Sequence, residues 1–163
     1  MTRKASFPPV IDARTRVLVL GSLPGERSLA ERRYYAHPQN QFWRLVGGAI
    51  GADLAALPYD QRLAALLARG VGLWDVVASA RRTGSGDAAI AEATANDLPR
   101  LVDWLPDLRA VAFNGGKAAA IGRPLLAGRP IALLALPSSS PLHTIGLAAK
   151  QPAWMALAEH LAD

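Results

Sequence analysis

A ten-residue segment, residues 34–43, combines the side chains that a pocket for a flat polar ring requires. It reads Tyr-Tyr-Ala-His-Pro-Gln-Asn-Gln-Phe-Trp, so aromatic rings, a His-Pro turn and the amide of Asn40 lie close together. Aromatic faces stack on a planar ring, and an amide offers its edge both a hydrogen-bond donor and an acceptor. The segment therefore predicts a ligand site; the alternative is a loop that its aromatics pin to the core.

Polar or small residues also follow three apolar runs, each of which is typical of a buried strand. Residues 21–25 read Gly-Ser-Leu-Pro-Gly, residues 114–116 read Asn-Gly-Gly, and residues 137–144 read Pro-Ser-Ser-Ser-Pro-Leu-His-Thr. In α/β sheets, ligands bind beyond the carboxyl ends of the parallel strands. We therefore expect these segments and residues 34–43 to meet at one edge of a sheet.

The order of apolar runs and amphipathic stretches predicts the fold that positions these segments. Strands are expected at residues 16–21, 71–77, 109–113 and 131–136, and helices at 28–33, 42–50, 59–68, 96–104, from about 117, and at 152–161. Strands that alternate with helices, each strand a continuous apolar run, predict an α/β protein. We expect a three-layer α/β/α sandwich around a short, mainly parallel four-stranded sheet, with residues 1–163 as a single domain.

Composition excludes several kinds of site. The chain has 163 residues and no cysteine, which excludes disulfides, iron–sulfur clusters and thiolate zinc sites. The three histidines, His37, His143 and His160, lie far apart and show no metal-ligand spacing. No apolar run is long enough to span a membrane, and the N-terminus has no secretory signal, so we expect a cytoplasmic protein without a metal.

The net charge is +5 and the isoelectric point is about 10.2, which suits an anionic partner such as nucleic acid. The pairs Arg32-Arg33 and Arg81-Arg82 flank candidate loops, and arginine favours bidentate contacts with phosphate. The alternative for each pair is a solvated basic surface without a ligand.

The polar segments exclude some chemistries. They contain no pair of carboxylates for glycoside hydrolysis. Residues 21–25 match neither the Walker loop nor the G-x-G-x-x-G pattern, and residues 138–140 lack the G-x-S-x-G elbow of a serine nucleophile. Amides, hydroxyls, aromatic rings and backbone donors remain, and this set suits binding a base and a phosphate backbone and positioning a water.

Three motifs in order resemble those of the uracil-DNA glycosylase superfamily: residues 21–25, the Tyr-Tyr-x-His-Pro-x-Asn-x-Phe-Trp segment, and Ser140-Pro141-Leu142. The resemblance spans residues 17–161. It is closest to the hypoxanthine-DNA (deoxyinosine) glycosylase branch, with the mismatch-specific uracil/thymine branch next. It implies a monofunctional DNA glycosylase of base excision repair that flips out a deaminated base, hypoxanthine or else uracil, and removes it by hydrolysis.

The resemblance also implies the catalytic residue. The mismatch-specific branch carries an Asn at the position of Leu23, and the main uracil branch a His at the position of Ser138, so both helpers are absent here. In the hypoxanthine branch, the Asn of the His-Pro-x-Asn segment positions the water, which makes Asn40 the expected catalytic residue. The alternative for Asn40 is a turn residue after Pro38.

Further roles follow from the same resemblance. Tyr34 or Tyr35 is expected to stack on the base, with Phe42 as a competitor, and Leu142 to be the wedge that fills the gap left by the flipped base. The alternatives are helix capping for Asn114, a solvated residue for Lys117 and loop packing for Leu142. The expected base-binding residues are Gly21, Ser22, Tyr34, Tyr35, Phe42 and Asn114. The expected DNA-binding residues are Lys117, Ser139, Ser140, Leu142 and His143.

We expect the partner to be DNA that contains a deaminated base, and the protein to be a monomer that needs no cofactor, metal or membrane. A rival hypothesis is a nucleic-acid-binding module that keeps the fold but has no activity, since Leu23 and Ser138 replace catalytic side chains. A weaker one is an α/β hydrolase or transferase that acts on a small nucleoside.

Overall fold

A four-stranded parallel sheet forms the centre of the computed structural model, which describes residues 3–162. Its strands are β2 (Val17–Gly21), β3 (Val71–Asp75), β6 (Ala110–Asn114) and β7 (Ala132–Leu136), in the order β3-β2-β6-β7. All three strand pairs are parallel. The predicted sheet is therefore confirmed, since each of its strands arises from one of the continuous apolar runs.

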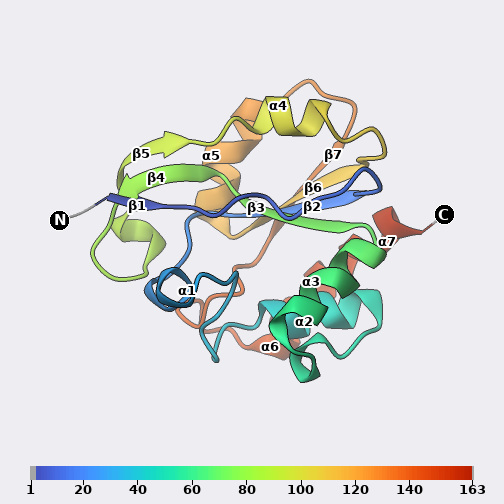
Figure 1. The fold of residues 1–163 in the computed structure, drawn as a ribbon, viewed down its shortest axis with the longest axis horizontal. Helices are drawn as coiled ribbons and strands as arrows, with labels where there is room; N and C mark the ends of the chain where they lie inside the picture. Colours follow the sequence, from blue (N-terminus) through green and yellow to red (C-terminus); the bar gives the residue numbers. More distant parts are fainter. Residues whose placement is uncertain (1–2, 163) are drawn as a thin grey trace.

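Helices cover both faces of this sheet (Figure 1). On one side lie α4 (Leu98–Asp103) and α5 (Gly116–Leu126), and on the other lie α2 (Phe42–Ile50), α3 (Tyr59–Ala68), α6 (Leu147–Trp154) and α7 (Ala156–Leu161). Alternate side chains of β2 point to opposite layers: Val17 and Val19 belong to the cluster with α2, and Leu18 and Leu20 to the cluster with α4 and α5. The arrangement is the predicted three-layer α/β/α sandwich.

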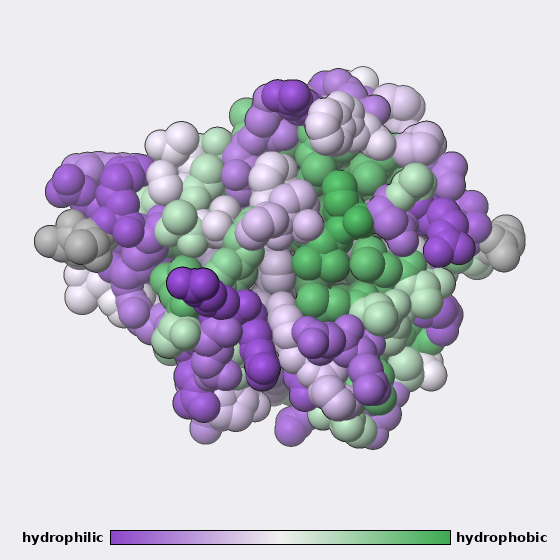
Figure 2. Space-filling model, in the orientation of Figure 1, coloured by the Kyte–Doolittle hydropathy of each residue, from purple (hydrophilic) through white to green (hydrophobic). Residues whose placement is uncertain are grey.

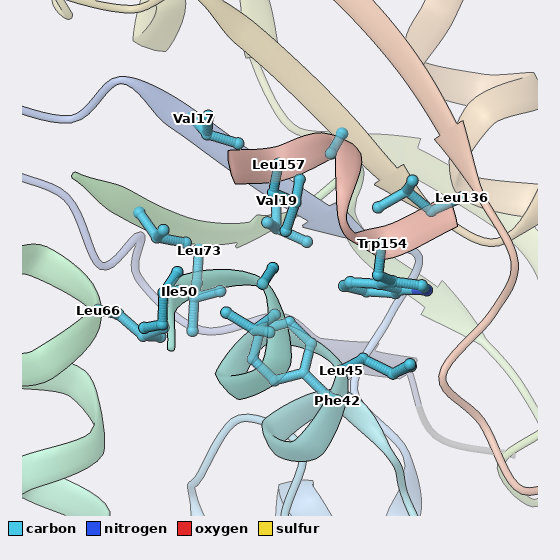
Figure 3. Packing of buried hydrophobic residues seen from close by; sticks show 14 of the residues in the cluster. Val17, Val19, Phe42, Leu45, Ile50, Leu66, Leu73, Leu136, Trp154 and Leu157 are labelled. Carbon is cyan, nitrogen blue, oxygen red and sulfur yellow. The ribbon is translucent and has the colours of Figure 1, made fainter. Parts of the chain in front are cut away.

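The larger core lies between the sheet and α2. Figure 3 shows side chains of β2, β3 and β7 that point towards Phe42, Leu45 and Ile50 of α2, with Trp154 and Leu157 beside them. Phe42, Leu45 and Trp154 are fully buried. This packing fixes α2, and with it the segment 34–41 that leads into the helix.

A second, antiparallel sheet was not predicted. It consists of β1 (Arg3–Ala5), β4 (Val77–Arg81) and β5 (Ala91–Ala95), in the order β1-β4-β5. The stretch predicted as one strand at 71–77 leaves β3 at Val76 and continues as β4 in the other sheet, as Figure 1 shows. All residues of β5 are exposed, so this strand has no apolar face by which its sequence could be recognised.

Several helix boundaries differ from those predicted. The stretch predicted at 28–33 is α1 (Glu26–Glu31), and the helix predicted at 152–161 is two helices that meet at Met155. The helix predicted at 96–104 begins two residues later as α4, and the side chain of Asp97 caps it by accepting a hydrogen bond from the backbone N–H of Arg100. Short 3₁₀ helices lie at Leu54–Ala56 and Asp87–Ala89.

The surface in the orientation of Figure 1 is mainly hydrophilic, with hydrophobic residues gathered to the right of its centre (Figure 2). Within residues 3–162, no helix has both the length and the apolar character needed to cross a bilayer.

The strand register places four carboxyl ends at one level. Gly21 of β2 pairs with Asp75 of β3, and Asn114 of β6 pairs with Leu136 of β7. β2 and β6 are themselves paired up to Leu20 and Phe113, one residue before Gly21 and Asn114. The last residues of all four strands therefore form one edge, from which the polar segments extend.

The contact between α5 and the sheet predicts the effect of one substitution. A Cβ on Gly122 would overlap with Cε1 of the buried Phe113 and lie 3.0 Å from Cγ1 of Val76. We expect Gly122→Ala to destabilise the fold by about 1–3 kcal/mol through overpacking. Gly116→Ala in the same helix meets nothing within 4 Å and should be neutral or stabilising by up to about 1 kcal/mol. Urea unfolding of both variants measures the difference, and equal midpoints would contradict this account.

Candidate active site

A cavity of about 400 Å³ opens at the carboxyl edge of the parallel sheet, and this size suits a small-molecule ligand. The ends of β2, β3 and β6 form part of its lining through Gly21, Asp75 and Asn114. The other lining residues come from four segments that include the start of α1, namely residues 22–28, 34–40, 85–87 and 138–143. The expectation that the polar segments meet at one edge is confirmed.

Asn40 lines this cavity with its side-chain oxygen already engaged. Oδ1 accepts hydrogen bonds from the backbone N–H of Phe42 at 3.0 Å and from the hydroxyl of Ser139 at 2.8 Å. A backbone N–H can only donate, so the atom that faces Phe42 must be the oxygen and not the nitrogen. These two bonds occupy both lone pairs of Oδ1, and the side-chain NH₂ is left as the group with which Asn40 can contact a ligand.

Ser139 joins Asn40 to Asn114 across the two polar segments. Its hydroxyl accepts from Nδ2 of Asn114 at 2.9 Å, and its backbone N–H donates to Oδ1 of Asn114 at 2.8 Å. Its carbonyl accepts from the backbone N–H of Gln41 at 3.0 Å. Nδ2 of Asn114 also donates to the hydroxyl of Tyr35 at 3.3 Å. A continuous hydrogen-bonded chain therefore holds Tyr35, Asn114, Ser139 and Asn40 in fixed positions.

The prediction that Ser139 contacts DNA is wrong. Its side chain is 1% exposed, and its hydroxyl is occupied by Asn40 and Asn114. Asn114 lines the cavity, as its predicted contact with the base requires, but most of its hydrogen-bonding groups are already used within the protein. Both hydrogens of its NH₂ have acceptors, so only one lone pair of Oδ1 remains for a base.

The aromatic residues divide into two that line the cavity and two that support it. Tyr34 and Tyr35 both line it, whereas Phe42 and Trp43 do not. The ring of Tyr35 stacks on Phe42 with centroids 3.9 Å apart and an angle of 9° between the planes. Phe42 is fully buried, so the prediction that it contacts a base is wrong: it lies behind Tyr35 instead.

Tyr34 and Tyr35 are held differently. The hydroxyl of Tyr34 donates to the carbonyl of Pro8 at 2.8 Å, and Tyr34 is 5% exposed. Tyr35 has a positive φ of 53°, an uncommon conformation for a residue with a side chain. Its neighbour Trp43 donates from the indole N–H to the Tyr35 carbonyl at 3.1 Å and fixes that conformation. Burial raises the pKa of both tyrosines, so both hydroxyls stay protonated at neutral pH.

The loop of residues 138–143 forms one rim of the cavity. Leu142 is 68% exposed, and Leu142, Ser140 and His143 all line the cavity. Two residues of α6 bind the backbone at this loop. Nζ of the buried Lys150 donates to the carbonyl of Ser140, and the indole N–H of Trp154 donates to the carbonyl of Pro137, just before the loop. Lys117, the remaining predicted DNA contact, is half-buried in the first turn of α5 and does not line the cavity.

The predicted pair Arg81-Arg82 is engaged within the protein, whereas Arg32 and Arg33 are exposed. Arg82 is 1% exposed, and its guanidinium donates to the carbonyls of Leu23, Pro24 and Gly84. It therefore stabilises the loop of residues 21–25 from inside. Arg81 forms an ion pair with Glu92 at 3.0 Å.

Asp75 is a site residue that was missed. It is the last residue of β3, is 4% exposed, and lines the cavity. Burial, and then the neighbouring charge of Asp87, raise the pKa of its carboxyl to about 7, against the smaller opposing effect of Arg82. The sequence carried one signal of this residue: a single charged side chain within the otherwise apolar run of residues 71–77.

Gly21 and Ser22, both predicted to bind the base, line the cavity beside Asp75. A Cβ on Gly21 would lie 2.7 Å from Oδ1 of Asp75 and 3.0 Å from the hydroxyl of Tyr35, so only glycine leaves room for both groups. The hydroxyl of Ser22 donates to Oδ1 of Asp87 at 2.5 Å. These contacts make the cavity floor polar and keep it open.

Comparison with known proteins connects this arrangement to one family. The family model described as the uracil DNA glycosylase superfamily matches residues 8–158. A hypoxanthine DNA glycosylase of Methanosarcina barkeri is 41% identical over 93% of this chain and 96% of its own length. One from Methanosarcina acetivorans is 40% identical over 96% of this chain and 99% of its own length.

A solved structure has the same fold throughout its length. It is a solution NMR structure of a Methanosarcina acetivorans protein proposed to be a uracil DNA glycosylase. It has a TM-score of 0.89 and 40% sequence identity, and the match covers 98% of this chain and 99% of that one.

The buried carboxyl of Asp75 predicts a pH-dependent stability. Its pKa is about 7 in the folded protein, against 3.8 for an ordinary aspartic acid, so the folded state binds more protons between these values. Stability is therefore lost as the pH rises from about 4 to 7, by at most about 4 kcal/mol. Asp75→Asn removes this loss, and we expect its gain in melting temperature over the wild type to be larger at pH 8 than at pH 5. A pH-independent difference would contradict a raised pKa.

Ser139 predicts a second effect on stability. Ser139→Ala leaves Oδ1 of Asn40 and Nδ2 of Asn114 each without one hydrogen-bond partner, and we expect a loss of about 1–3 kcal/mol in unfolding free energy. Ser138→Ala is the matched control, since Ser138 is less buried and, among residues 3–162, its hydroxyl accepts only from the backbone N–H of Ser140. Denaturant unfolding compares the two variants. An equal loss in unfolding free energy would show that the buried hydrogen bonds of Ser139 contribute no more than the bond of Ser138.

Proposed function

The chain belongs to the uracil DNA glycosylase superfamily, and from this premise we propose that it removes hypoxanthine from DNA. As a member of this superfamily it is a DNA N-glycosylase of base excision repair. The choice of hypoxanthine rests on the two relatives of about 40% identity, which carry that activity in their names and match almost the whole chain. The substrate is DNA that contains the damaged base.

In this proposal Asn40 positions the water that attacks the sugar carbon. The NH₂ of Asn40 can donate one hydrogen bond to the water oxygen, which fixes the water and leaves a lone pair for the attack. Ser139 and the backbone N–H of Phe42 hold the amide, so little reorganisation is needed during the reaction. This prior fixing of the amide is the observation that best supports the role of Asn40.

The flipped base occupies the cavity between the strand ends and the aromatic segment. Tyr35 stacks on the base with the ring face that Phe42 does not cover, and Tyr34 closes the cavity beside it. Gly21 and Ser22 form the floor, and Asn114 offers its remaining lone pair to a donor on the base. Stacking of this kind contributes about 1–3 kcal/mol per base.

The rim loop contacts the duplex. Leu142 is the apolar wedge that enters the space left by the flipped nucleotide, which its exposure at the cavity rim supports. Ser140 and His143, on the same loop, and Lys117 bind the phosphates on either side. The net charge of +5 favours this association and makes it sensitive to salt.

Hydrolysis releases the base without cleaving the strand. A glycosylase that also cleaves the strand needs an amine that can form a Schiff base with the sugar. Among the residues that the structure describes, no lysine lines the cavity. The proposed enzyme is therefore monofunctional, and it uses water as its only nucleophile. We propose that it acts as a monomer in the cytoplasm, on the DNA of the nucleoid, without a cofactor or a metal.

Base release from labelled duplexes tests this proposal. The substrates carry hypoxanthine, uracil or a G·T mismatch, and the proteins are the wild type, Asn40→Ala and the exposed neighbour Gln39→Ala as control. We expect the wild type and Gln39→Ala to release hypoxanthine, and Asn40→Ala to be slower by about 10²–10³-fold. Duplex binding by Asn40→Ala should remain close to that of the wild type.

Two outcomes would contradict the proposal in different ways. Release of uracil but not hypoxanthine would move the enzyme to a uracil or mismatch specificity. Salt-dependent binding of all three duplexes without release of any base would favour a binding module over an enzyme for these substrates.

A further inference from the structure

We propose that Asp75 is a catalytic acid that donates a proton to the purine as it leaves the sugar. This inference rests on the proposed removal of hypoxanthine and adds a second catalytic group to it. Asn40 acts on the water, and Asp75 acts on the base.

The position of Asp75 places its carboxyl where a bound base must lie. It ends β3 at the floor of the cavity, in register with Gly21 of β2. Gly21 has no side chain to cover it: Oδ1 of Asp75 and the Tyr35 hydroxyl lie 2.7 and 3.0 Å from the point that a Cβ on Gly21 would occupy. A side chain at position 21 would overlap with this carboxyl. The glycine therefore leaves room for the acid, which lines the cavity although it is 4% exposed.

The donors around Asp75 are directed elsewhere. Its Oδ2 is buried and has no hydrogen-bond partner among residues 3–162. Arg82 donates to three backbone carbonyls, Ser22 donates to Asp87, and the side chain of Asn96 donates to the backbone oxygen of Asp75 rather than to its carboxyl. An ionised carboxylate in such a place would lack the hydrogen bonds that stabilise its charge.

Asp75 is therefore protonated more readily than an ordinary aspartic acid. The titratable groups that face it are Asp87 on the 3₁₀ helix at 87–89, Arg82 after β4, and Tyr34 and Tyr35 on the aromatic segment. Burial and the charge of Asp87 raise the pKa to about 7, and Arg82 opposes them in part. An acid of this strength holds its proton near neutral pH and can also release it, which is what general acid catalysis requires.

The departing base needs such a proton. When the bond between N9 and the sugar carbon breaks, its electron pair passes to the purine, which becomes negatively charged unless it is protonated. The proton of Asp75 moves to N7, so hypoxanthine leaves as a neutral molecule and Asp75 becomes a carboxylate. The water adds its oxygen to the sugar carbon and releases a proton to solvent, and Asp75 takes a proton back from solvent.

The protonated form is the one that can catalyse this step. A carboxylate at the cavity floor would repel the negative charge that develops on the base, whereas a neutral carboxyl stabilises that charge by donating a hydrogen bond. A buried acid with no partner also costs stability once it is ionised, and strongly shifted groups in a cavity are characteristic of functional sites. The position, the missing partner and the chemistry of the leaving group point to the same role.

The test is the pH dependence of base release from a hypoxanthine duplex under single-turnover conditions with saturating enzyme, from pH 5 to 9. We expect the wild-type rate to fall about tenfold per pH unit above the pKa of Asp75. Asp75→Asn cannot transfer a proton, and its rate should be lower by about 10²–10⁴-fold at pH 6 without this alkaline decline. Asp87→Asn removes the neighbouring negative charge and should shift the decline to lower pH.

Asp60→Asn is the control, since Asp60 is exposed on α3 and does not line the cavity; both its rate and its pH profile should equal those of the wild type. An alkaline decline that persisted in Asp75→Asn would come from another group, and that result would overturn the inference. A rate in Asp75→Asn within a few-fold of the wild type would overturn it too.

The failure of this inference is distinguishable from failure of the proposed function. A wild type that releases hypoxanthine with a pH profile unchanged by Asp75→Asn refutes the acid and leaves the proposed function in place. A wild type that releases no hypoxanthine refutes both. Duplex binding by Asp75→Asn, measured in parallel, shows whether a lower rate arises from the chemical step or from lost affinity.

Discussion

The common level at which the four parallel strands end is the constraint on which the site depends. Gly21, Asp75 and Asn114 are the last residues of β2, β3 and β6, and the strand register brings them to one edge. Shifting one strand by a single residue would turn its side chains to the opposite face of the sheet and remove its group from the cavity. The apolar clusters on both faces prevent such a shift, because each side chain of β2 is fully buried in its own layer. The core thereby fixes the chemistry at the edge.

The buried polar groups at this edge fall into two classes. Ser139 and Arg82, and all of Asn114 except one lone pair of its Oδ1, form hydrogen bonds within the protein and hold three loops against one another. Such networks make a site rigid and contribute to its precision. Asp75 differs from them, because it is equally buried but has a carboxyl oxygen without a partner among the described residues; the amide oxygen of Gln41 is also unpaired there, but Gln41 carries no charge. A group of this kind reduces stability, and the proposed contact of Asp75 with the departing base accounts for its retention.

Much of the fold could be predicted from the sequence because the central strands are continuous apolar runs between turn residues. The same reasoning failed for β5, whose residues are all exposed and which pairs with the preceding strand β4. It also failed to divide residues 71–81 into two strands. That division occurs at Val76, whose N–H still donates to Gly21 of β2, whereas its carbonyl accepts from Asn96 beside β5. No local pattern of residue types encodes a change of sheet.

The site was predictable in its location but not in its division of roles. The amino-acid types of residues 34–43 and 137–144 by themselves indicated an amide, aromatic rings and hydroxyls at strand ends, because those types are unusual in plain scaffolding. Tertiary structure alone decided that Ser139 lies inside with its hydroxyl on Asn40, that Phe42 lies behind Tyr35, and that Asp75 is buried with one oxygen unpaired among residues 3–162. The physical reason is that residue type fixes which bonds a side chain can make, whereas its burial and its partners depend on segments brought together across the whole chain.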